Sequence, residues 1–322
     1  MGMVFGTISG ISKPVARLVQ GTVPLSSQEE ERSLALLDGV IECGGNTFDT
    51  AHGYGGGDPE RLFGRWLKER GNRESVVILS KGAHHNQDRR RVTPYDIESD
   101  LHDSLARMQV EYVDLYLLHR DDENVPVGPI VEVLNRLKLE GLIRAFGGSN
   151  WSHKRIADAN EYANANGLTP FAVSSPNFSL AEQHKEPWDN CVSITGDIHH
   201  DARLWYRESQ FPVFSWSSLG GGFFSGKISR DKLVFDDYYL KLAVECYVSD
   251  ANFARLDRAA EIGKSHGLSA IQVALAWIMS QGINLFPLVG CHTAEEYRNL
   301  ADAIDIRLSE DECSYLNLKS NG

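Results

Sequence analysis

Cysteine is sparse in this chain of 322 residues, and none of its five cysteines forms a C-x-x-C pair with another. Their odd number and wide spacing indicate neither a disulfide framework nor a zinc knuckle, and they favour a reducing compartment. No stretch approaches the about 18 consecutive apolar residues that a membrane span needs, and the N-terminus lacks a signal-peptide pattern. We therefore expect a cytoplasmic protein with no membrane partner.

Runs of positive charge are equally rare. The longest is Arg89-Arg90-Arg91, and the formal net charge is −12 at pH 7, which argues against nucleic acid as a partner. The histidine pairs at 84–85 and 199–200 lack further residues at the spacing of metal ligands, so we expect no metal. Because no Pro/Ser-rich linker or low-complexity segment divides the chain, we expect a single domain over residues 1–322.

Short apolar segments alternate with helical patterns along the chain. The expected strands are residues 17–22, 46–50, 76–80, 112–118, 143–149, 171–175, 212–216 and 283–288. The expected helices are one after residue 30, those at 59–70, from 93, 129–140, 153–165, 201–210, 294–303 and 310–318, and two between 217 and 282. Capping boxes at Ser27, Ser269 and Thr293 mark three of the helix starts.

Eight strand–helix units predict an α/β fold, the (β/α)8 TIM barrel. Residues 3–12 are expected to form a short capping hairpin at the N-terminus, and extra helices and loops lie near the C-terminus. A doubly wound open sheet has the same local pattern. The number of units and the missing G-x-G-x-x-G after the first strand favour the barrel.

Polar residues stand where the expected strands end, which is where barrels place their chemistry. Asp49, Lys81 and His119 end three strands, and Tyr54 follows in a Gly-rich loop. Taken singly, these residues have ordinary explanations: a turn-capping acid, a loop tyrosine packed on the surface, a surface lysine, a satisfied buried histidine. Taken together, a buried ammonium would stay charged beside Asp49 and would lower the pKa of Tyr54 from about 10. The set predicts a general acid that protonates an oxygen while another group delivers hydride.

The segments that carry these residues resemble the aldo-keto reductase family over nearly the whole chain. They are Asp49-Thr50-Ala51-x-x-Tyr54-Gly55, Ser80-Lys81, Asp114-Leu115-Tyr116-Leu117-Leu118-His119, Gly147-Gly148-Ser149-Asn150-Trp151, Ser217-Ser218-Leu219-Gly220-Gly221-Gly222 and Pro287-Leu288-Val289-Gly290. The resemblance implies an NAD(P)H-dependent reductase that converts an aldehyde or ketone, sugar-like or aryl, to an alcohol. Tyr54 would donate the proton, Lys81 and Asp49 would tune it, and His119 would orient the carbonyl.

The same resemblance implies a set of cofactor contacts. Ser149 and Asn150 would hold the nicotinamide carboxamide, and Trp216 would stack on its ring. The remaining contacts would be Gly21, Thr22, Asp49, Ser175, Ser217, Leu219, Gly221, Gly290, His292, Glu296 and Asn299. Ser175 stands where many members have glutamine, so a water or Asn177 would have to replace that amide.

The choice of cofactor, the kind of function and the oligomeric state stay open in the sequence. We expect NADPH, with His292 and Arg298 near the 2′-phosphate, but Glu296 could instead accept a ribose hydroxyl of NADH. The expected substrate contacts are His52, Tyr54, His119, Arg120, Trp151 and Phe178. The alternative to an enzyme is a cofactor-binding regulatory subunit that acts through a protein partner. The oligomeric state is not indicated by the sequence.

Overall fold

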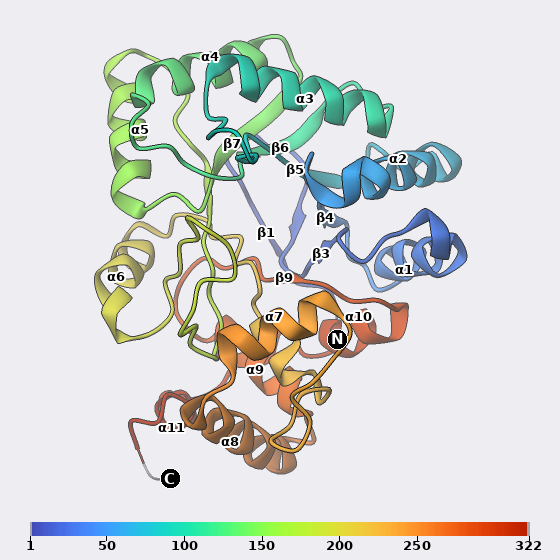
Figure 1. The fold of residues 1–322 in the computed structure, drawn as a ribbon, viewed down its shortest axis with the longest axis vertical. Coiled ribbons are helices and arrows are strands. Elements are labelled where there is room, and N and C mark those ends of the chain that lie inside the picture. Colours follow the sequence, from blue (N-terminus) through green and yellow to red (C-terminus); the bar gives the residue numbers. More distant parts are fainter. Residues whose placement is uncertain (1, 321–322) are drawn as a thin grey trace.

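The computed structural model describes residues 2–320, and its parallel strands curl into a barrel surrounded by helices (Figure 1). Seven strands form one sheet in the order β8-β7-β6-β5-β4-β3-β9. Their bounds are Val19–Gly21 (β3), Thr47–Asp49 (β4), Val77–Gly82 (β5), Val113–Leu118 (β6), Ile143–Ser149 (β7), Val173–Ser175 (β8) and Leu288–Val289 (β9). The predicted (β/α)8 class is confirmed.

The barrel closes through residues 212–216, between β8 and β9. Val213 forms parallel bridges with Ser174 on one side and Leu285 on the other. Backbone bonds of 2.8 Å from Phe214 N to Ser174 O and from Phe286 N to Val213 O hold these bridges. The expected seventh strand is therefore only a set of bridges, and β9 begins later than the expected eighth. Pro212 and Pro287 cannot donate to a regular ladder, because proline has no N–H.

Helices cover the outside of the barrel. Their bounds are Glu30–Glu42 (α1), Asp58–Arg70 (α2), Pro94–Met108 (α3), Val127–Leu139 (α4), His153–Ala165 (α5), His200–Ser209 (α6), Tyr238–Tyr247 (α7), Asp250–His266 (α8), Ala270–Met279 (α9), Ala294–Ala301 (α10) and Glu310–Leu316 (α11). Short 3-10 turns are Ser27–Glu29 (η1), Tyr54–Gly57 (η2), Asp197–His199 (η3) and Gly220–Ser225 (η4). The helices α7 to α11 gather at one end of the molecule (Figure 1).

The helix starts differ in part from the expected ones. Ser269 forms the predicted capping box, but η1 is capped by Ser26 instead of Ser27. The structure has three helices between residues 217 and 282 instead of two. The extra one, α7, begins after Asp237, whose side chain accepts a hydrogen bond of 2.8 Å from Leu240 N. This N-cap turns part of the expected loop into a helix.

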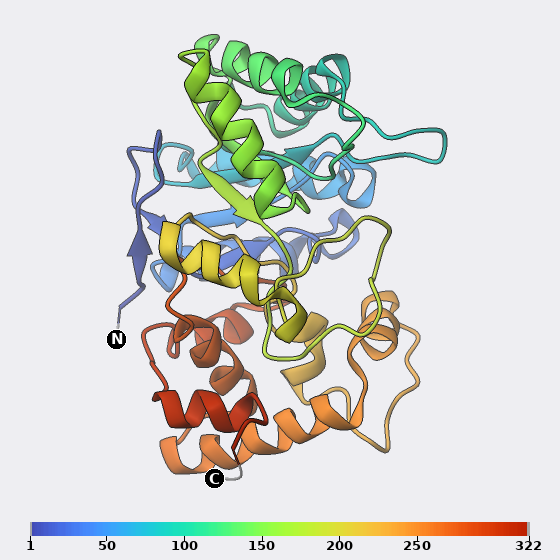
Figure 2. The ribbon, with the colours of Figure 1, turned by 90° about the vertical axis from the view of Figure 1, so that its left-hand side faces the viewer.

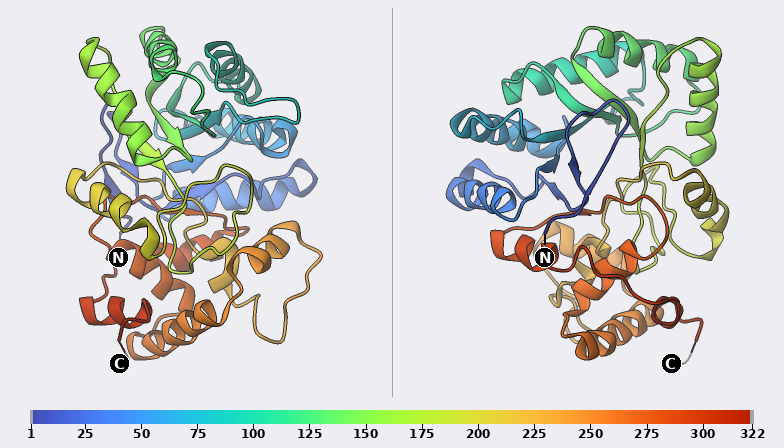
Figure 3. Two further views of the ribbon diagram at one scale, coloured as in Figure 1. Left: turned by 60° about the vertical axis from the view of Figure 1, so that its left-hand side comes forward. Right: turned by 180° about the vertical axis from the view of Figure 1, so that it is seen from behind.

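A two-stranded hairpin covers the amino-terminal end of the barrel. Its strands are Phe5–Gly6 (β1) and Val15–Ala16 (β2), so the second strand lies beyond the expected limit of residue 12. Ile8, at the hairpin's tip, packs into the apolar interior of the barrel. The hairpin lies at the opposite end from three long loops in Figure 2, and it crosses the barrel in the right-hand view of Figure 3. One end of the barrel is thus sealed, and the other carries the loops.

The alternation of side chains along the strands decides what faces inward. Val77 and Leu79 of β5 belong to the interior cluster, as do Leu115 and Leu117 of β6. Lys81 and His119 follow two residues later, so they share the inward direction. The interior is apolar at the hairpin end and polar at the loop end. Across residues 2–320, no helix is long and apolar enough to cross a membrane.

Gly64 lies where α2 packs closest to α3. A Cβ atom on Gly64 would lie 2.2 Å from the backbone oxygen of Met108. Gly64→Ala should therefore lower the free energy of unfolding by about 2 kcal/mol, because overpacking outweighs the gain in helix propensity of about 1 kcal/mol. Urea unfolding measures this change, with the exposed Lys68→Ala in the same helix as control. Wild-type stability in Gly64→Ala would mean that the two helices pack more loosely than described.

Candidate active site

A buried ion pair stands at the loop end of the barrel. Asp49 ends β4 and Lys81 lies in β5; both are almost fully buried, and Lys81 Nζ lies 2.6 Å from Asp49 Oδ1. The same ammonium donates hydrogen bonds to Tyr54 Oη at 2.9 Å and to Thr50 O at 3.3 Å. Three of the four predicted catalytic residues are thus in direct contact.

Burial changes the pKa values of Lys81 and Tyr54 in opposite directions. Burial lowers the pKa of Lys81, but Asp49 and Tyr54 more than offset it, so the net pKa is raised and the ammonium stays charged. Burial raises the pKa of Tyr54 above 10, and the Lys81 ammonium opposes this shift without reversing it. The expected fall of the Tyr54 pKa is therefore wrong for this structure. The phenol is protonated at neutral pH.

His119 completes the set from the end of β6. Its ring lies edge-on to the Tyr54 ring, with centroids 5.7 Å apart and an interplanar angle of 80°. Burial, reinforced by the Lys81 and Arg120 cations, lowers the pKa of His119 well below 6.5. The imidazole is therefore neutral at neutral pH and able to donate one hydrogen bond.

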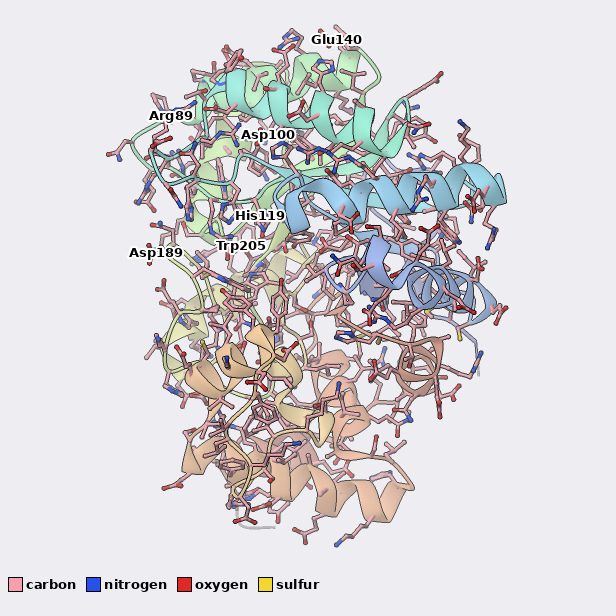
Figure 4. All side chains as sticks on the ribbon, turned by 45° about the vertical axis from the view of Figure 1, so that its right-hand side comes forward. Arg89, Asp100, His119, Glu140, Asp189 and Trp205 are labelled. Carbon is pink, nitrogen blue, oxygen red and sulfur yellow. The ribbon has the colours of Figure 1, made fainter. Side chains whose placement is uncertain are left out.

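One buried carboxylate, Asp100 of α3, holds the loop after β5. It accepts a bond of 2.8 Å from Ala83 N and pairs with Arg91 at 2.5 Å. Ala83 has a φ of 58°, a left-handed conformation that is unfavourable for alanine and needs such support. This loop carries His84, whose ring lies 4.8 Å from that of His119. Asp100 and His119 are labelled in Figure 4.

The predicted carboxamide contacts also meet at the strand ends. Ser149 Oγ donates to Ser175 O at 3.0 Å, and Asn150 Nδ2 donates to His119 O at 3.2 Å. Asn150 Oδ1 accepts a bond of 3.1 Å from Trp216 Nε1. The Ser175 hydroxyl is buried and has no hydrogen-bond partner in the described residues. It is a polar atom that a bound ligand could satisfy.

Asn177, the alternative to the missing glutamine, is already hydrogen-bonded. Its amide donates to Trp216 O at 3.1 Å and to Tyr247 Oη at 3.2 Å, and its oxygen accepts from Ser193 Oγ at 2.8 Å. These bonds occupy both ends of the amide, as other bonds do for Asn150, and the alternative in which Asn177 holds a carboxamide stays a prediction.

The turn after residue 216 has the backbone of an anion-binding loop. Ser217, Gly220, Gly221 and Gly222 all have positive φ values, between 48° and 100°. Successive residues of this kind turn backbone N–H groups toward a concave surface. Leu219, in the same turn, is buried at 8% exposure and packs against the core. The predicted pyrophosphate contacts Ser217, Leu219 and Gly221 thus lie in one turn.

The remaining predicted cofactor residues flank this turn on β3 and after β9. Thr22, which follows Gly21, has a buried hydroxyl without a partner among residues 2–320. Beyond Gly290, one Glu296 oxygen accepts from His292 N at 2.7 Å, and the other lies 3.9 Å from Lys227 Nζ. Only half of the expected capping box forms at Thr293, whose hydroxyl accepts from Glu296 N. Asn299 is exposed, and its backbone oxygen accepts from Gln272.

The sequence model of the Aldo/keto reductase family matches residues 17–320. The chain belongs to this family. It is therefore an NAD(P)H-dependent oxidoreductase, as the sequence predicts. The orphaned hydroxyls of Thr22 and Ser175 and the left-handed turn at 217–222 fit a nicotinamide dinucleotide.

Several relatives of this aldo-keto reductase are identified by name. A probable aryl-alcohol dehydrogenase of Saccharomyces cerevisiae is 24% identical over 304 residues, which cover 91% of this chain and 88% of the relative. An NADP(+) aryl-alcohol dehydrogenase of Phanerodontia chrysosporium is 28% identical over 323 residues, which cover 91% of this chain and 77% of the relative. The solved glycerol dehydrogenase of Gluconobacter oxydans has the same fold, with a TM-score of 0.78 and 23% identity. The match covers 96% of this chain and 93% of the dehydrogenase.

Three of the predicted substrate contacts point elsewhere. The His52 ring lies 3.2 Å from Asp103 Oδ2 and from Arg107 Nη2 of α3, away from Tyr54. Trp151 and Phe178 are at most 1% exposed. Trp151 Nε1 donates to Arg120 O at 3.2 Å, and Phe178 packs on Trp277 with ring centroids 5.3 Å apart. Both rings are thus packed into the protein, and their roles as substrate contacts stay predictions.

The loop between β8 and η3 also contributes residues to the site, and these were not predicted from the sequence. Trp188 donates to Tyr238 Oη at 3.1 Å, and its ring lies 6.3 Å from that of Trp216. Burial raises the pKa of the Cys191 thiol, and the nearby Arg120 guanidinium opposes this rise. The loop has no periodic pattern, so only the fold brings it to the site. Among the described residues, no group of three or more His, Cys, Asp or Glu side chains is placed to hold a metal.

Proposed function

We propose that this aldo-keto reductase reduces an aldehyde or ketone to an alcohol, with Tyr54 as the general acid. The observation that carries the proposal is the bond of 2.9 Å from Lys81 Nζ to Tyr54 Oη. A protonated phenol beside a fixed ammonium can give up its proton at the moment of reaction, because the phenolate that forms is paired at once.

The proposed reaction divides the work between the chain and its cofactor. A reduced nicotinamide cofactor, when bound, would supply the hydride for the carbonyl carbon. Neutral His119 donates a hydrogen bond that orients the carbonyl oxygen. Tyr54 transfers its proton to that oxygen as negative charge develops there, and Lys81 stabilises the phenolate left behind. Asp49 keeps Lys81 charged and in place.

An aryl carbonyl fits the surroundings of Tyr54 better than a sugar. Trp188, Tyr238 and Tyr239 are 37%, 57% and 49% exposed, so aromatic surface is available where the loops meet. Burial raises the pKa of Tyr239, and the nearby Tyr54 hydroxyl adds to this shift. The relatives named aryl-alcohol dehydrogenases support this choice of substrate class.

The proposed cofactor is NADPH. Glu296 is engaged by His292 N–H, and Arg32 Nη1 donates to His292 O at 3.2 Å. Lys227 stands 3.9 Å from the other Glu296 oxygen. Two cations thus border the position expected for a 2′-phosphate, while Glu296 is already bonded and Arg32 is itself paired with Glu29 at 2.6 Å.

The first prediction concerns the proton donor. Tyr54→Phe should lower turnover about 10²–10⁴-fold, the typical contribution of general acid catalysis, with little change in cofactor affinity. NADPH oxidation with a panel of aryl aldehydes measures the turnover, and quenching of protein fluorescence measures the affinity. Near-normal turnover in Tyr54→Phe would refute the role of Tyr54. Cofactor binding without turnover of any carbonyl by the wild type would favour the regulatory subunit.

The second prediction concerns the pH profile. The acid must be protonated to act, so the alkaline limb of the rate profile follows the Tyr54 pKa. Since Lys81 lowers that pKa against the effect of burial, Lys81→Met should move the alkaline limb to higher pH and reduce the rate strongly. Lys68→Met, on the exposed face of α2, is the matched control. An unchanged limb at full rate would rule out the coupling.

The third prediction concerns cofactor choice. Glu296→Gln keeps an acceptor for His292 N–H and frees Lys227 for a phosphate. Removing a like charge beside a phosphate is worth roughly 1–2 kcal/mol at an effective dielectric near 20 after screening, or about tenfold in the NADPH:NADH affinity ratio. Dissociation constants for both cofactors test this, with Glu295→Gln in the same turn as control. A constant ratio would mean that Glu296 does not face the 2′ position.

A further inference from the structure

Arg120 differs from the other buried cations of this chain. Three lysine or arginine residues within residues 2–320 are buried: Lys81, Arg120 and Arg255, at 2%, 4% and 7% exposure. Lys81 is paired with Asp49 and Arg255 with Glu182. Arg120, the second of the three, has no carboxylate within ion-pair distance among the described residues. A buried charge without a counter-charge is costly, so an unpaired one needs an explanation.

Backbone oxygens satisfy Arg120 only in part. Nε donates to Asp189 O at 3.3 Å, and Nη1 donates to His119 O at 2.9 Å. Nη2 donates to no residue that the structure describes, and it is not one of the fully enclosed unsatisfied atoms. It therefore keeps some solvent-accessible surface, although Arg120 as a whole is only 4% exposed. A guanidinium with one free edge matches the geometry of a carboxylate.

The Arg120 guanidinium is close enough to the reacting groups to act on their charges. Arg120 follows His119 directly; its charge adds to the effect of burial that lowers the pKa of His119, and it opposes the effect of burial that raises the pKa of Tyr54. Asp189, whose backbone Arg120 holds, belongs to the loop that brings Trp188 to Trp216 and is labelled in Figure 4. Histidines 84 and 85 are close enough to feel the same charge, and burial keeps both largely neutral by lowering their pKa values. The Asp189 carboxylate acts to raise the pKa of Arg120 but forms no ion pair with it among the described residues, so it only partly offsets the buried charge.

We propose that Arg120 binds an anionic substituent, such as a carboxylate, on the carbonyl substrate. This inference rests on the proposed carbonyl reduction and narrows its substrate class to aromatic carbonyl compounds that carry an acidic group. In the free protein the buried cation is incompletely compensated, and the substrate supplies the missing counter-charge. An uncharged analogue of the same shape leaves Arg120 unpaired. The preference for an acidic substrate therefore arises both from its attraction to Arg120 and from the cost of leaving Arg120 unpaired with the analogue.

The wild-type enzyme gives the first test. We would measure kcat/KM for 2-, 3- and 4-carboxybenzaldehyde and for the methyl ester of each, with NADPH. Charge-assisted hydrogen bonds are strong enough for the acid to exceed its ester by about tenfold or more in at least one isomer. An ester equal to or better than its acid in every isomer overturns the proposal. Failure of both acids and esters to react would instead refute the proposed carbonyl reduction.

The variant Arg120→Met then assigns the preference to this residue. Because Nη1 also holds His119 O, the variant is expected to be slower with every substrate, so the decisive quantity is the acid:ester ratio. That ratio should fall at least tenfold in Arg120→Met and recover in part in Arg120→Lys. Arg90→Met removes a nearby cation that lies 3.6 Å from Asp122 Oδ1, and it should leave the ratio unchanged. An unchanged ratio in a folded Arg120→Met, or an equal fall in Arg90→Met, overturns the assignment.

Discussion

The buried pair of Lys81 and Asp49 is the constraint on which the site depends. An ammonium at 2% exposure is stable only beside a carboxylate, so the two strands that carry the pair must keep one register. Asp49 pairs with Leu79 across the sheet, which places its side chain next to the inward-facing Lys81. A slip of one residue would turn Lys81 outward, because strand side chains alternate. The fold and the site therefore specify each other.

A second set of charges lies outside the barrel wall and positions the loops. Asp100 of α3 holds Ala83 and Arg91 after β5, and its Oδ1 lies 3.7 Å from His52 Nδ1 in the loop that carries Tyr54. One helix thus contacts the loops that follow β4 and β5. Arg107 adds a bond of 2.7 Å to His52 O. Precise geometry at Tyr54 comes from these contacts, since a glycine-rich loop has no intrinsic preference for one conformation.

The sequence predicted residues on strands better than residues in loops. Asp49, Lys81 and His119 could be placed because the strands were recognisable and a period of two fixes which side chains converge. His52 and Trp151 could not, because a loop side chain points toward whatever tertiary partner it finds. For these two residues the partners are Asp103 and the backbone of Arg120. The seventh strand was predicted as regular, but it forms only bridges, and Pro212 at its start cannot donate to a ladder.

The direction of the Tyr54 shift changes the role that Lys81 plays in the proposed reaction. A phenol whose pKa is raised by burial is fully protonated at neutral pH, so Lys81 is not needed to create the acid form. The difficult species is the phenolate that remains after proton transfer, because burial penalises an unpaired anion. An ammonium 2.9 Å away meets that need only at the stage when charge appears on the oxygen. The contact therefore stabilises the transition state more than the ground state, which is the condition for accelerating a reaction.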